Sequence, residues 1–331
     1  MTAPTLDIVA IGNAIVDVIA QADDAFIASE GVAKGSMRLM DEATSDSLYG
    51  RMGSGIEMSG GSAANTIAGM AALGCKGGFI GQVADDQLGE VFAHDIRANG
   101  IVFDTAVRSG SPSTARCLIL VTPDAQRTMN TFLGASQFLP ESALNPALIQ
   151  SAAILYLEGY LWDPEEPRAA MRKGIALARE AGRKVAFTLS DAFCISRHRD
   201  DFRRLIDDGQ LDILFANEGE ILSLMETEDF EAAVAAVAGK VDTLVVTRSE
   251  RGAIAVQGGK RYAVPAEPID QVVDTTGAGD LFAAGFLAGQ AQGRGVEDSL
   301  TMGAIAAAEV ISHYGARPEA DLAALVKQRL G

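Results

Sequence analysis

The second half of the chain alternates short apolar runs with longer helical stretches in a regular order. The apolar runs lie near residues 154–157, 184–189, 213–216 and 243–247. The helical stretches lie at 167–181, 230–238, 279–292 and 296–312. Strands that alternate with helices in this way pair in parallel and are covered by helices on both faces of the sheet. The order therefore predicts an α/β fold with a mostly parallel central sheet.

The first 133 residues depart from this alternation. Short apolar runs predict strands at 6–11 and 14–20, and helical spacing predicts helices at 62–73 and 86–98. Two further runs, 115–122 and 127–133, flank a polar turn and predict a hairpin. We expect residues of about 13–60 and 100–133 to form a small β lid, inserted discontinuously into one large α/β domain of residues 1–331.

Composition narrows the classes of partner. The chain has 27 Lys and Arg against 44 Asp and Glu, a formal net charge of −17. Nucleic acid and anionic membranes bind through clustered basic residues, so both are disfavoured as partners. The three cysteines are far apart in the sequence. No apolar run reaches the roughly 18 residues of a membrane span. Residues 1–12 lack the basic start of a signal peptide. These features predict a cytoplasmic protein with reduced thiols.

Residues 273–287 are the most informative segment, because two glycines in a turn of small residues open a helix there. Gly277 and Gly279 precede an apolar run, with Asp280 in its first turn. Free N–H groups at a helix N-terminus bind anions, although an aspartate there is also a common helix cap. A dinucleotide fingerprint needs glycine where this chain has Phe282, and no lysine follows the glycines as in a Walker loop. A bound nucleotide therefore requires another architecture.

Residues 274–280, Asp-Thr-Thr-Gly-Ala-Gly-Asp, resemble the C-terminal signature of the ribokinase-like, or PfkB, carbohydrate and nucleoside kinases. Three further segments agree with that family in order and spacing. They are Gly12-Asn13 with Asp17, the glycine segment at 60–65, and Asn217-Glu218-Gly219-Glu220 after a predicted strand. The resemblance spans nearly the whole chain. It implies a ribokinase-like fold and transfer of phosphate from ATP to a hydroxymethyl group.

The resemblance implies catalytic roles around the helix N-terminus. Asp280 is implied as the general base, which takes the proton of the acceptor hydroxyl as its oxygen attacks the γ-phosphate. The N–H groups of Gly277, Ala278 and Gly279 are implied to stabilise the transferring phosphoryl group, in agreement with the anion site expected there. Arg127, just past the predicted hairpin turn, is placed like a lid arginine that approaches the phosphates on closure.

The resemblance also implies nucleotide and metal ligands. Asn217 and Glu220 would hold Mg²⁺ through water, which suits an ion that keeps much of its hydration. The alternative is that Glu218 and Glu220 simply favour a helix N-terminus. Asp274 and Thr276 occupy positions that, in some relatives, contribute to a monovalent cation site with the loop around Gly315, so potassium is a further candidate cofactor. The implied ATP contacts are Asn217, Thr247, Gly252, Gly277 and Gly279.

The acceptor site is implied by the N-terminal motifs. Asp17 can accept hydrogen bonds from two adjacent hydroxyls of a sugar. Within the family these details look most like the adenosine kinases, because 188–193 resembles a strand end that sets Phe193 against a purine. Tyr160 and Trp162 fit a base-stacking position and a core position equally. The implied substrate-binding residues are Asn13, Asp17, Gly60, Gly61, Asn65, Met129 and Phe193.

The expected activity is an Mg·ATP-dependent kinase that converts adenosine to AMP, with a ribokinase- or fructokinase-type sugar kinase as the alternative. A regulator that binds nucleotide or sugar without catalysis would have lost the base, the anion-hole glycines or the Asn-x-x-Glu element, and none is lost. The expected partners are small molecules, bound by a monomer or a homodimer.

Overall fold

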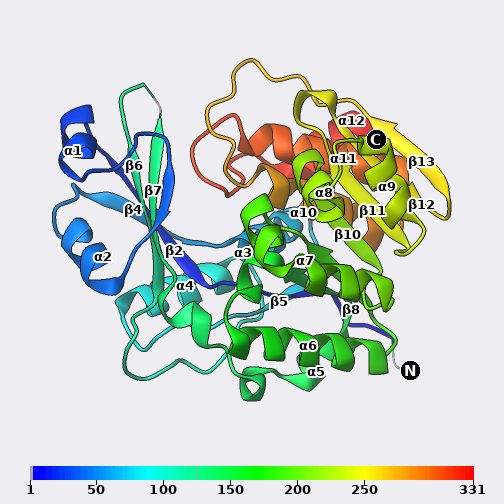
Figure 1. Ribbon diagram of the computed structural model, residues 1–331, viewed down its shortest axis with the longest axis horizontal. Helices are drawn as coiled ribbons and strands as arrows, with labels where there is room; N and C mark the ends of the chain where they lie inside the picture. Colours follow the sequence, from blue (N-terminus) through cyan, green and yellow to red (C-terminus); the bar gives the residue numbers. More distant parts are fainter. Residues whose placement is uncertain (1–2, 125) are drawn as a thin grey trace.

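The computed structural model describes residues 3–124 and 126–331, which form two sheets (Figure 1). The strands from β11 to β5 of the larger sheet are parallel, while β12 and β13 are antiparallel at one edge. The predicted α/β class with a mostly parallel sheet is confirmed. In spatial order this sheet contains β13 (Lys260–Val264), β12 (Ala253–Gln257), β11 (Thr243–Thr247), β10 (Ile213–Asn217), β9 (Lys184–Thr188), β8 (Ala152–Glu158), β1 (Leu6–Ile11) and β5 (Gly77–Ile80).

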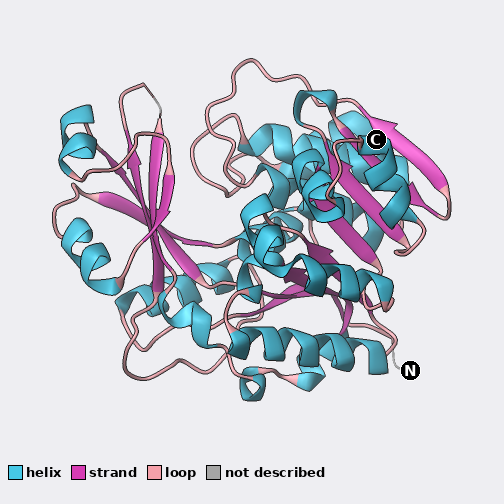
Figure 2. Cartoon of the chain, in the orientation of Figure 1, coloured by secondary structure: helices cyan, strands magenta, loops and turns pink. Residues whose placement is uncertain are grey.

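Helices cover both faces of the large sheet (Figure 2). Successive side chains of a strand point to opposite faces, so Ile8 and Ala10 of β1 pack into one apolar cluster, and Val9 and Ile11 into the other. The first cluster is completed by α3 (Ser62–Ala72), α4 (Gln87–Ala98), α10 (Ala278–Ala291), α11 (Val296–Val310) and α12 (Leu322–Leu330). The second is completed by α5 (Pro146–Ser151), α6 (Glu165–Glu180), α7 (Ala192–Asp207), α8 (Glu218–Met225) and α9 (Phe230–Ala238).

The smaller sheet has five strands. Helices α1 (Asp24–Ser29) and α2 (Glu42–Tyr49) lie beside it in Figure 1, and their buried Ile27 and Leu48 belong to the same apolar cluster as Val16 and Val18 of β2. The opposite face carries Asp17, because side chains alternate along β2. The strand order is β3 (Met37–Leu39), β7 (Arg127–Phe132), β6 (Ala115–Val121), β2 (Ile15–Gln21) and β4 (Gly55–Gly60).

Residues 13–60, expected to belong to a small β lid, also contain the two helices α1 and α2, which the sequence pattern did not predict. Both added helices begin at an aspartate: the Asp23 side chain accepts a hydrogen bond from the Phe26 N–H, and the Asp41 side chain accepts one from the Thr44 N–H. Such N-caps are the signal that marks these helices in the sequence. The helices are short, so their apolar faces give only a weak periodic pattern.

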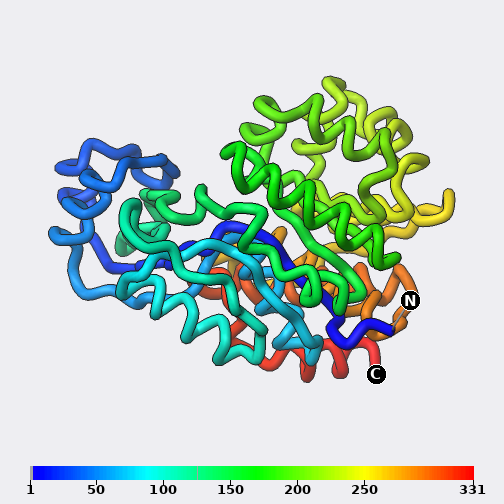
Figure 3. The backbone as a smooth tube through the Cα atoms, turned by 90° about the horizontal axis from the view of Figure 1, so that it is seen from below, coloured from blue at the N-terminus to red at the C-terminus, as the bar shows by residue number. Residues whose placement is uncertain are grey.

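The small sheet projects from one end of the molecule (Figure 3). Both chain ends lie at the opposite end in that view, beside the large sheet. Within the described ranges, none of the helices combines the length and apolar character needed to cross a bilayer.

Candidate active site

The carboxyl ends of the parallel strands carry several of the polar residues predicted to bind ligands. Asn13 lies just beyond β1, Asn217 ends β10 and Thr247 ends β11. In a parallel sheet these ends share one edge, where open α/β folds bind their ligands. The N-terminus of α10 and the start of α3 supply the remaining groups.

Asp280 lies half-buried in the first turn of α10 and faces α3. Its Oδ1 accepts a hydrogen bond from Ser62 Oγ at 2.6 Å, and its Oδ2 accepts one from Asn65 Nδ2 at 3.0 Å. The N-cap of α10 is Gly277, so the alternative role of Asp280 as helix cap is wrong. Burial raises the pKa of Asp280, while the two hydrogen bonds and the charge of Arg317 act in the opposite direction.

The turn before α10 presents free backbone donors. Gly277 has a φ of 78°, and a Cβ there would lie 2.6 Å from the Ala316 Cβ, so only glycine fits this position. Within residues 3–124 and 126–331, no group accepts a hydrogen bond from the N–H of Gly277 or Gly279. The Ala278 N–H donates to the Thr275 carbonyl at 3.2 Å, so the structure leaves two of the three expected donors free. Such donors at the N-terminus of a 14-residue helix favour an anion.

Arg127, at the start of β7, pairs with Asp274, and both side chains are buried. Asp274 Oδ1 also accepts a hydrogen bond from the Thr276 N–H at 3.0 Å, and Oδ2 accepts one from the Gly315 N–H at 3.3 Å. The structure therefore brings together Asp274, Thr276 and the loop around Gly315. Burial lowers the pKa of Arg127, and its Nε has no acceptor among the described residues. This arginine lies at the interface of the small sheet with the turn before α10.

Asp17 lies on β2 against the turn that leads into α3. A Cβ at Gly60 would lie 2.4 Å from Asp17 Oδ2, and a Cβ at Gly61, where φ is 97°, would lie 2.3 Å from the Asn13 carbonyl oxygen. Both glycines are therefore required for this close approach. Burial raises the pKa of Asp17 to about 6 against the charges of Arg127 and Arg317.

Asn65 provides an acceptor beside Asp280. Its Nδ2 is bound to Asp280, while its Oδ1 is buried and has no hydrogen-bond partner among the described residues. A buried amide oxygen without a donor is costly, so a ligand hydroxyl that donates to it would be stabilised there. Asn65, predicted to bind substrate, therefore has one atom that orients the carboxylate and one that is available to a ligand.

Glu158, at the end of β8, was not among the predicted site residues, although the structure places it against Asn13 and the start of α3. Its side chain is fully buried, and its Oε1 accepts hydrogen bonds from Asn13 N at 2.8 Å and Nδ2 at 2.7 Å. Its Oε2 accepts one from the Ala63 N–H at 2.7 Å. Burial raises the pKa of Glu158 to about 7. The available sequence signal was a glutamate that directly follows a buried apolar strand and precedes Gly159.

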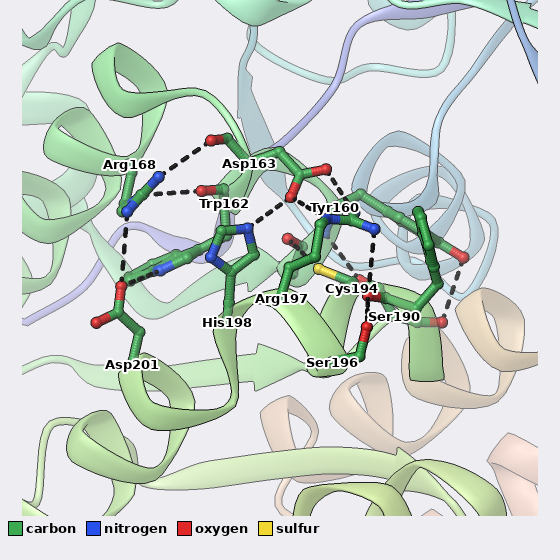
Figure 4. Close-up of polar contacts among 12 residues, drawn as sticks. Tyr160, Trp162, Asp163, Arg168, Ser190, Cys194, Ser196, Arg197, His198 and Asp201 are labelled. Carbon is green, nitrogen blue, oxygen red and sulfur yellow. Dashed lines mark hydrogen bonds and ion pairs between the residues drawn. The ribbon is translucent and has the colours of Figure 1, made fainter.

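Trp162 belongs to the core. It is fully buried and makes edge-to-face contacts with Phe187 and Phe202, at ring-centroid distances of 5.9 Å each. Its Nε1 donates to Asp201 Oδ2 at 3.0 Å, as Figure 4 shows. Of the two alternatives left open for this residue, core packing is correct.

Phe193, in contrast, is 67% exposed in the first turn of α7. The Arg197 guanidinium lies over its ring at 3.9 Å and is itself held by Asp163 (Figure 4). Tyr160 is also exposed, and its hydroxyl donates to the Ser190 carbonyl at 3.2 Å. Both aromatic rings therefore offer apolar surface outside the core.

Asn217 and Glu220 form a reciprocal helix cap at the start of α8. The Glu220 N–H donates to Asn217 Oδ1 at 2.8 Å, while the Glu220 carboxylate accepts from Asn217 N at 3.0 Å and from Nδ2 at 2.5 Å. Burial raises the pKa of Glu220 to about 7. Each capped oxygen retains a second lone pair, so this donor set fits a hydrated Mg²⁺, which prefers oxygen ligands and keeps its waters.

The remaining predicted ATP contacts lie further along the same edge. Thr247 is half-buried at the end of β11. Gly252 has a φ of 79°, and a Cβ there would lie 2.0 Å from the Val264 carbonyl oxygen. Glycine is required at this position because the start of β12 packs closely against the end of β13. The glycine is therefore not in itself evidence for a bound nucleotide.

The inner face of the small sheet is apolar around its charged residues. Strand register places Met129 beside Met37, and Thr131 beside Leu39, on the same face as Asp17 and Arg127. Met37 and Leu39 are exposed.

Comparison with known proteins places this fold and site in a class. A probable sugar kinase from Rhizobium etli superposes with a TM-score of 0.91, is 45% identical, and is matched over 98% of this chain and 99% of its own. The adenosine kinase from Sinorhizobium meliloti has a TM-score of 0.90 and 47% identity over the same shares. The class is therefore that of the ribokinase-like kinases.

Residues 6–322 match the pfkB family carbohydrate kinase model, so the chain belongs to that family. The adenosine kinase of Saccharomyces cerevisiae is 26% identical over 337 residues, covering 95% of this chain and 96% of the relative. The chain is a phosphotransferase with an alcohol group as acceptor and acts on a nucleoside or a sugar. Membership also implies the use of ATP and Mg²⁺.

Proposed function

We propose that the protein is a nucleoside kinase that phosphorylates the hydroxymethyl group of adenosine to form AMP, a step of purine salvage. The observation that carries this choice is the apolar surface of the small sheet on the face that carries Asp17, where Met37 and Leu39 are exposed and Met129 pairs with Met37. A purine needs such a surface to stack or pack against, whereas a free sugar does not. Similarity to the Sinorhizobium enzyme supports the same acceptor.

In this proposal Asp17, Asn65 and the turn at Gly60 and Gly61 bind the ribose. The paired hydroxyls donate to the Asp17 carboxylate and to the unpartnered Asn65 Oδ1. Asn13 acts through its hydrogen bonds with Glu158 rather than as an isolated ligand. Phe193 and Met129 contact the base.

Asp280 is the proposed general base. Ser62 and Asn65 orient its carboxylate, which accepts the acceptor's hydroxyl proton as the new O–P bond forms and the bond to the ADP leaving group breaks. The free N–H groups of Gly277 and Gly279 stabilise charge on the transferring phosphoryl group, and Ala278 lies between them. Arg127 adds positive charge from the small sheet.

Asn217 and Glu220 are the proposed holders of Mg²⁺, through its waters, and Thr247 and Gly252 line the ATP side. When bound, the ion neutralises charge on the phosphate oxygens. Potassium enters the proposal as an activator at Asp274 and Thr276, where it would share the Asp274 carboxylate with Arg127. Replacing potassium by tetramethylammonium at constant ionic strength tests that role.

A sugar kinase of the ribokinase or fructokinase type is the second candidate. The observation in its favour is that Asp17, Asn65 and the Glu158–Asn13 pair bind hydroxyl groups whether or not a base is attached. Similarity to the Rhizobium protein named as a probable sugar kinase supports it too. Either enzyme is proposed to act in the cytoplasm, as a monomer or a homodimer.

The test is ADP production from Mg·ATP with adenosine, inosine, guanosine, ribose and fructose offered separately. We expect saturation with adenosine at micromolar concentration and no turnover of free sugars. Asp280→Asn should lower kcat by about 10²–10⁴, the usual contribution of a positioned base. The matched control is Asp270→Asn, an exposed carboxylate in the loop that leads to α10. Turnover of a sugar with adenosine inert would discard the nucleoside proposal, and an active Asp280→Asn protein would remove the base assignment.

A further inference from the structure

Arg317, in the loop after α11, makes a set of contacts that no sequence motif suggested. Its Nε donates to the Ser59 carbonyl oxygen at 3.1 Å, and its Nη2 donates to the same oxygen and to Ser59 Oγ, each at 2.8 Å. Its Nη1 donates to the Ala64 carbonyl oxygen at 2.6 Å. All of these acceptors are neutral. Among the described residues, no carboxylate forms a contact ion pair with this guanidinium.

The two residues that Arg317 binds flank the proposed substrate-binding turn. Ser59 lies near the end of β4 in the small sheet, and Ala64 lies in the first turns of α3. Only residues 60–63 separate them, and these include Gly60, Gly61 and the Ser62 that donates to Asp280. Asp95 of α4 holds Ser59 from the other side, accepting from its N–H at 2.8 Å and from its Oγ at 2.5 Å. One guanidinium therefore fixes both ends of the turn.

The same guanidinium is a positive charge within a group of acids. Ser62 and Asn65 from α3 bind the Asp280 carboxylate directly. The charge of Asp280 also raises the pKa of groups on four other segments: Asp17 on β2, Tyr156 and Glu158 on β8, Tyr160 after β8, and Glu220 on α8. Arg317 is the positive charge that acts on Asp280, and Arg127 and Arg317 both act on Asp17. Burial lowers the pKa of Arg317 to about 10, so its side chain stays charged at neutral pH.

We infer that Arg317 is a positioning residue for phosphoryl transfer: its fork holds the 59–64 turn in place, and its charge stabilises the ionised Asp280 carboxylate. The inference rests on the proposal that Asp280 is the general base. The hydrogen bonds and the charge can be tested separately. Lysine keeps the positive charge, but its ammonium group cannot bind the Ser59 and Ala64 carbonyl groups at once as the planar guanidinium does.

The experiment is the pH profile of kcat for wild type, Arg317→Gln and Arg317→Lys. Ser59→Ala is the matched control, because it keeps the charge of Arg317 and removes only the hydroxyl that accepts from Arg317 and donates to Asp95. Activity needs an ionised base, so kcat falls as pH drops through the pKa of that base. This fall at low pH is the acid limb of the profile. Loss of a nearby positive charge raises this pKa. We therefore expect Arg317→Gln to move the acid limb upward by at most about one pH unit, because the two groups form no contact ion pair and a directly adjacent opposite charge lowers a carboxyl pKa by about 1–3.

Arg317→Lys should leave the acid limb where wild type has it and raise the KM of the acceptor, since the turn is no longer held at both ends. Ser59→Ala should also leave the limb in place. An acid limb that moves equally in the lysine and glutamine variants would overturn the inference, because the role would then be structural. An unmoved limb in Arg317→Gln overturns it as well. If Arg317→Gln does not fold, Arg317→Lys still tests the inference. This variant keeps the positive charge, so an acid limb that shifts in it would show that the charge does not set the pKa of the base.

The profile is measured with whichever acceptor the wild-type enzyme phosphorylates, so a wrong choice of adenosine does not affect the result. Failure of the base assignment is recognised separately, by turnover of Asp280→Asn. An inactive Asp280→Asn protein together with an unmoved limb in Arg317→Gln rejects the role of Arg317 alone.

Discussion

The buried Glu158 carboxylate should be one of the most sensitive positions in the acceptor region. It is 0% exposed and accepts three hydrogen bonds, from the N–H and Nδ2 of Asn13 and from the N–H of Ala63. Each buried donor that loses its acceptor costs about 1–3 kcal/mol. Glu158→Ala removes the acceptor of all three donors, so we expect the free energy of unfolding to fall by about 3–9 kcal/mol.

Glu158→Gln is the informative comparison. Its amide oxygen can keep both Asn13 donors, while its NH₂ group is turned toward the N–H of Ala63, so one donor is lost and the expected cost is about 1–3 kcal/mol. The pKa of Glu158 is raised to about 7 by burial, so the stability contributed by its protonated form is present below pH 4.5 and is lost as pH rises through 7. The difference between wild type and Glu158→Gln should therefore narrow from pH 5 to pH 8.

The assay is urea unfolding at each pH, with the free energy taken from midpoint and slope, and acceptor KM measured on the same proteins. Glu228→Gln, an exposed loop glutamate, is the control and should stay within about 0.5 kcal/mol of wild type. We expect KM to rise in both Glu158 variants because Asn13 loses its fixed orientation. Equal costs for alanine and glutamine, or a cost of Glu158→Ala below about 1 kcal/mol, would refute the reasoning from hydrogen bonds.

Three further outcomes follow from the same contacts. Burial raises the pKa of Asp17 to about 6, so kcat/KM for the acceptor should fall about tenfold from pH 7 to pH 5 as this group protonates; a fall of equal size in Asp17→Asn would contradict this. Arg127→Gln should cost about 3 kcal/mol in urea unfolding by leaving Asp274 buried without its cation, and adding Asp274→Asn should recover part of that cost; additive losses would show that the pair is not coupled. Trp162→Ala should lower the free energy of unfolding by about 3–5 kcal/mol. Phe193→Ala should raise the KM for adenosine and leave stability unchanged. The reverse pattern would place Phe193 in the core and Trp162 against the base.

Much of the candidate site was predictable because its chemistry is carried by short, contiguous motifs. The glycine turn before α10, the Gly60–Gly61 turn and the asparagine at the end of β10 are local features of the chain, since a backbone conformation or a helix cap depends on neighbouring residues. The large sheet was predictable for the same reason, because strand and helix periodicity are properties of short segments.

Glu158 and Arg317 were not predictable in this way. Neither belongs to a motif, and the partners of Glu158 lie 95 and 145 residues away, while those of Arg317 lie 253 and 258 residues away. Trp162 and Phe193 illustrate the same limit, since both are aromatic residues near strand ends, yet one is in the core and the other is exposed. Burial depends on what the rest of the chain packs against a position, and no local pattern contains that information.

The sequence by itself determined the α/β class, the strands and helices with a clear periodicity, and the glycine turns before α3 and α10, because periodicity, glycine conformations and helix starts are local physical properties. Only the tertiary structure decided which charges face one another. Asp280 is bound by α3 rather than capping its own helix, Arg127 meets Asp274, and Arg317 joins the small sheet to α3. Electrostatic and hydrogen-bond energies depend on distance in space, and that distance is set when remote segments of the chain pack together.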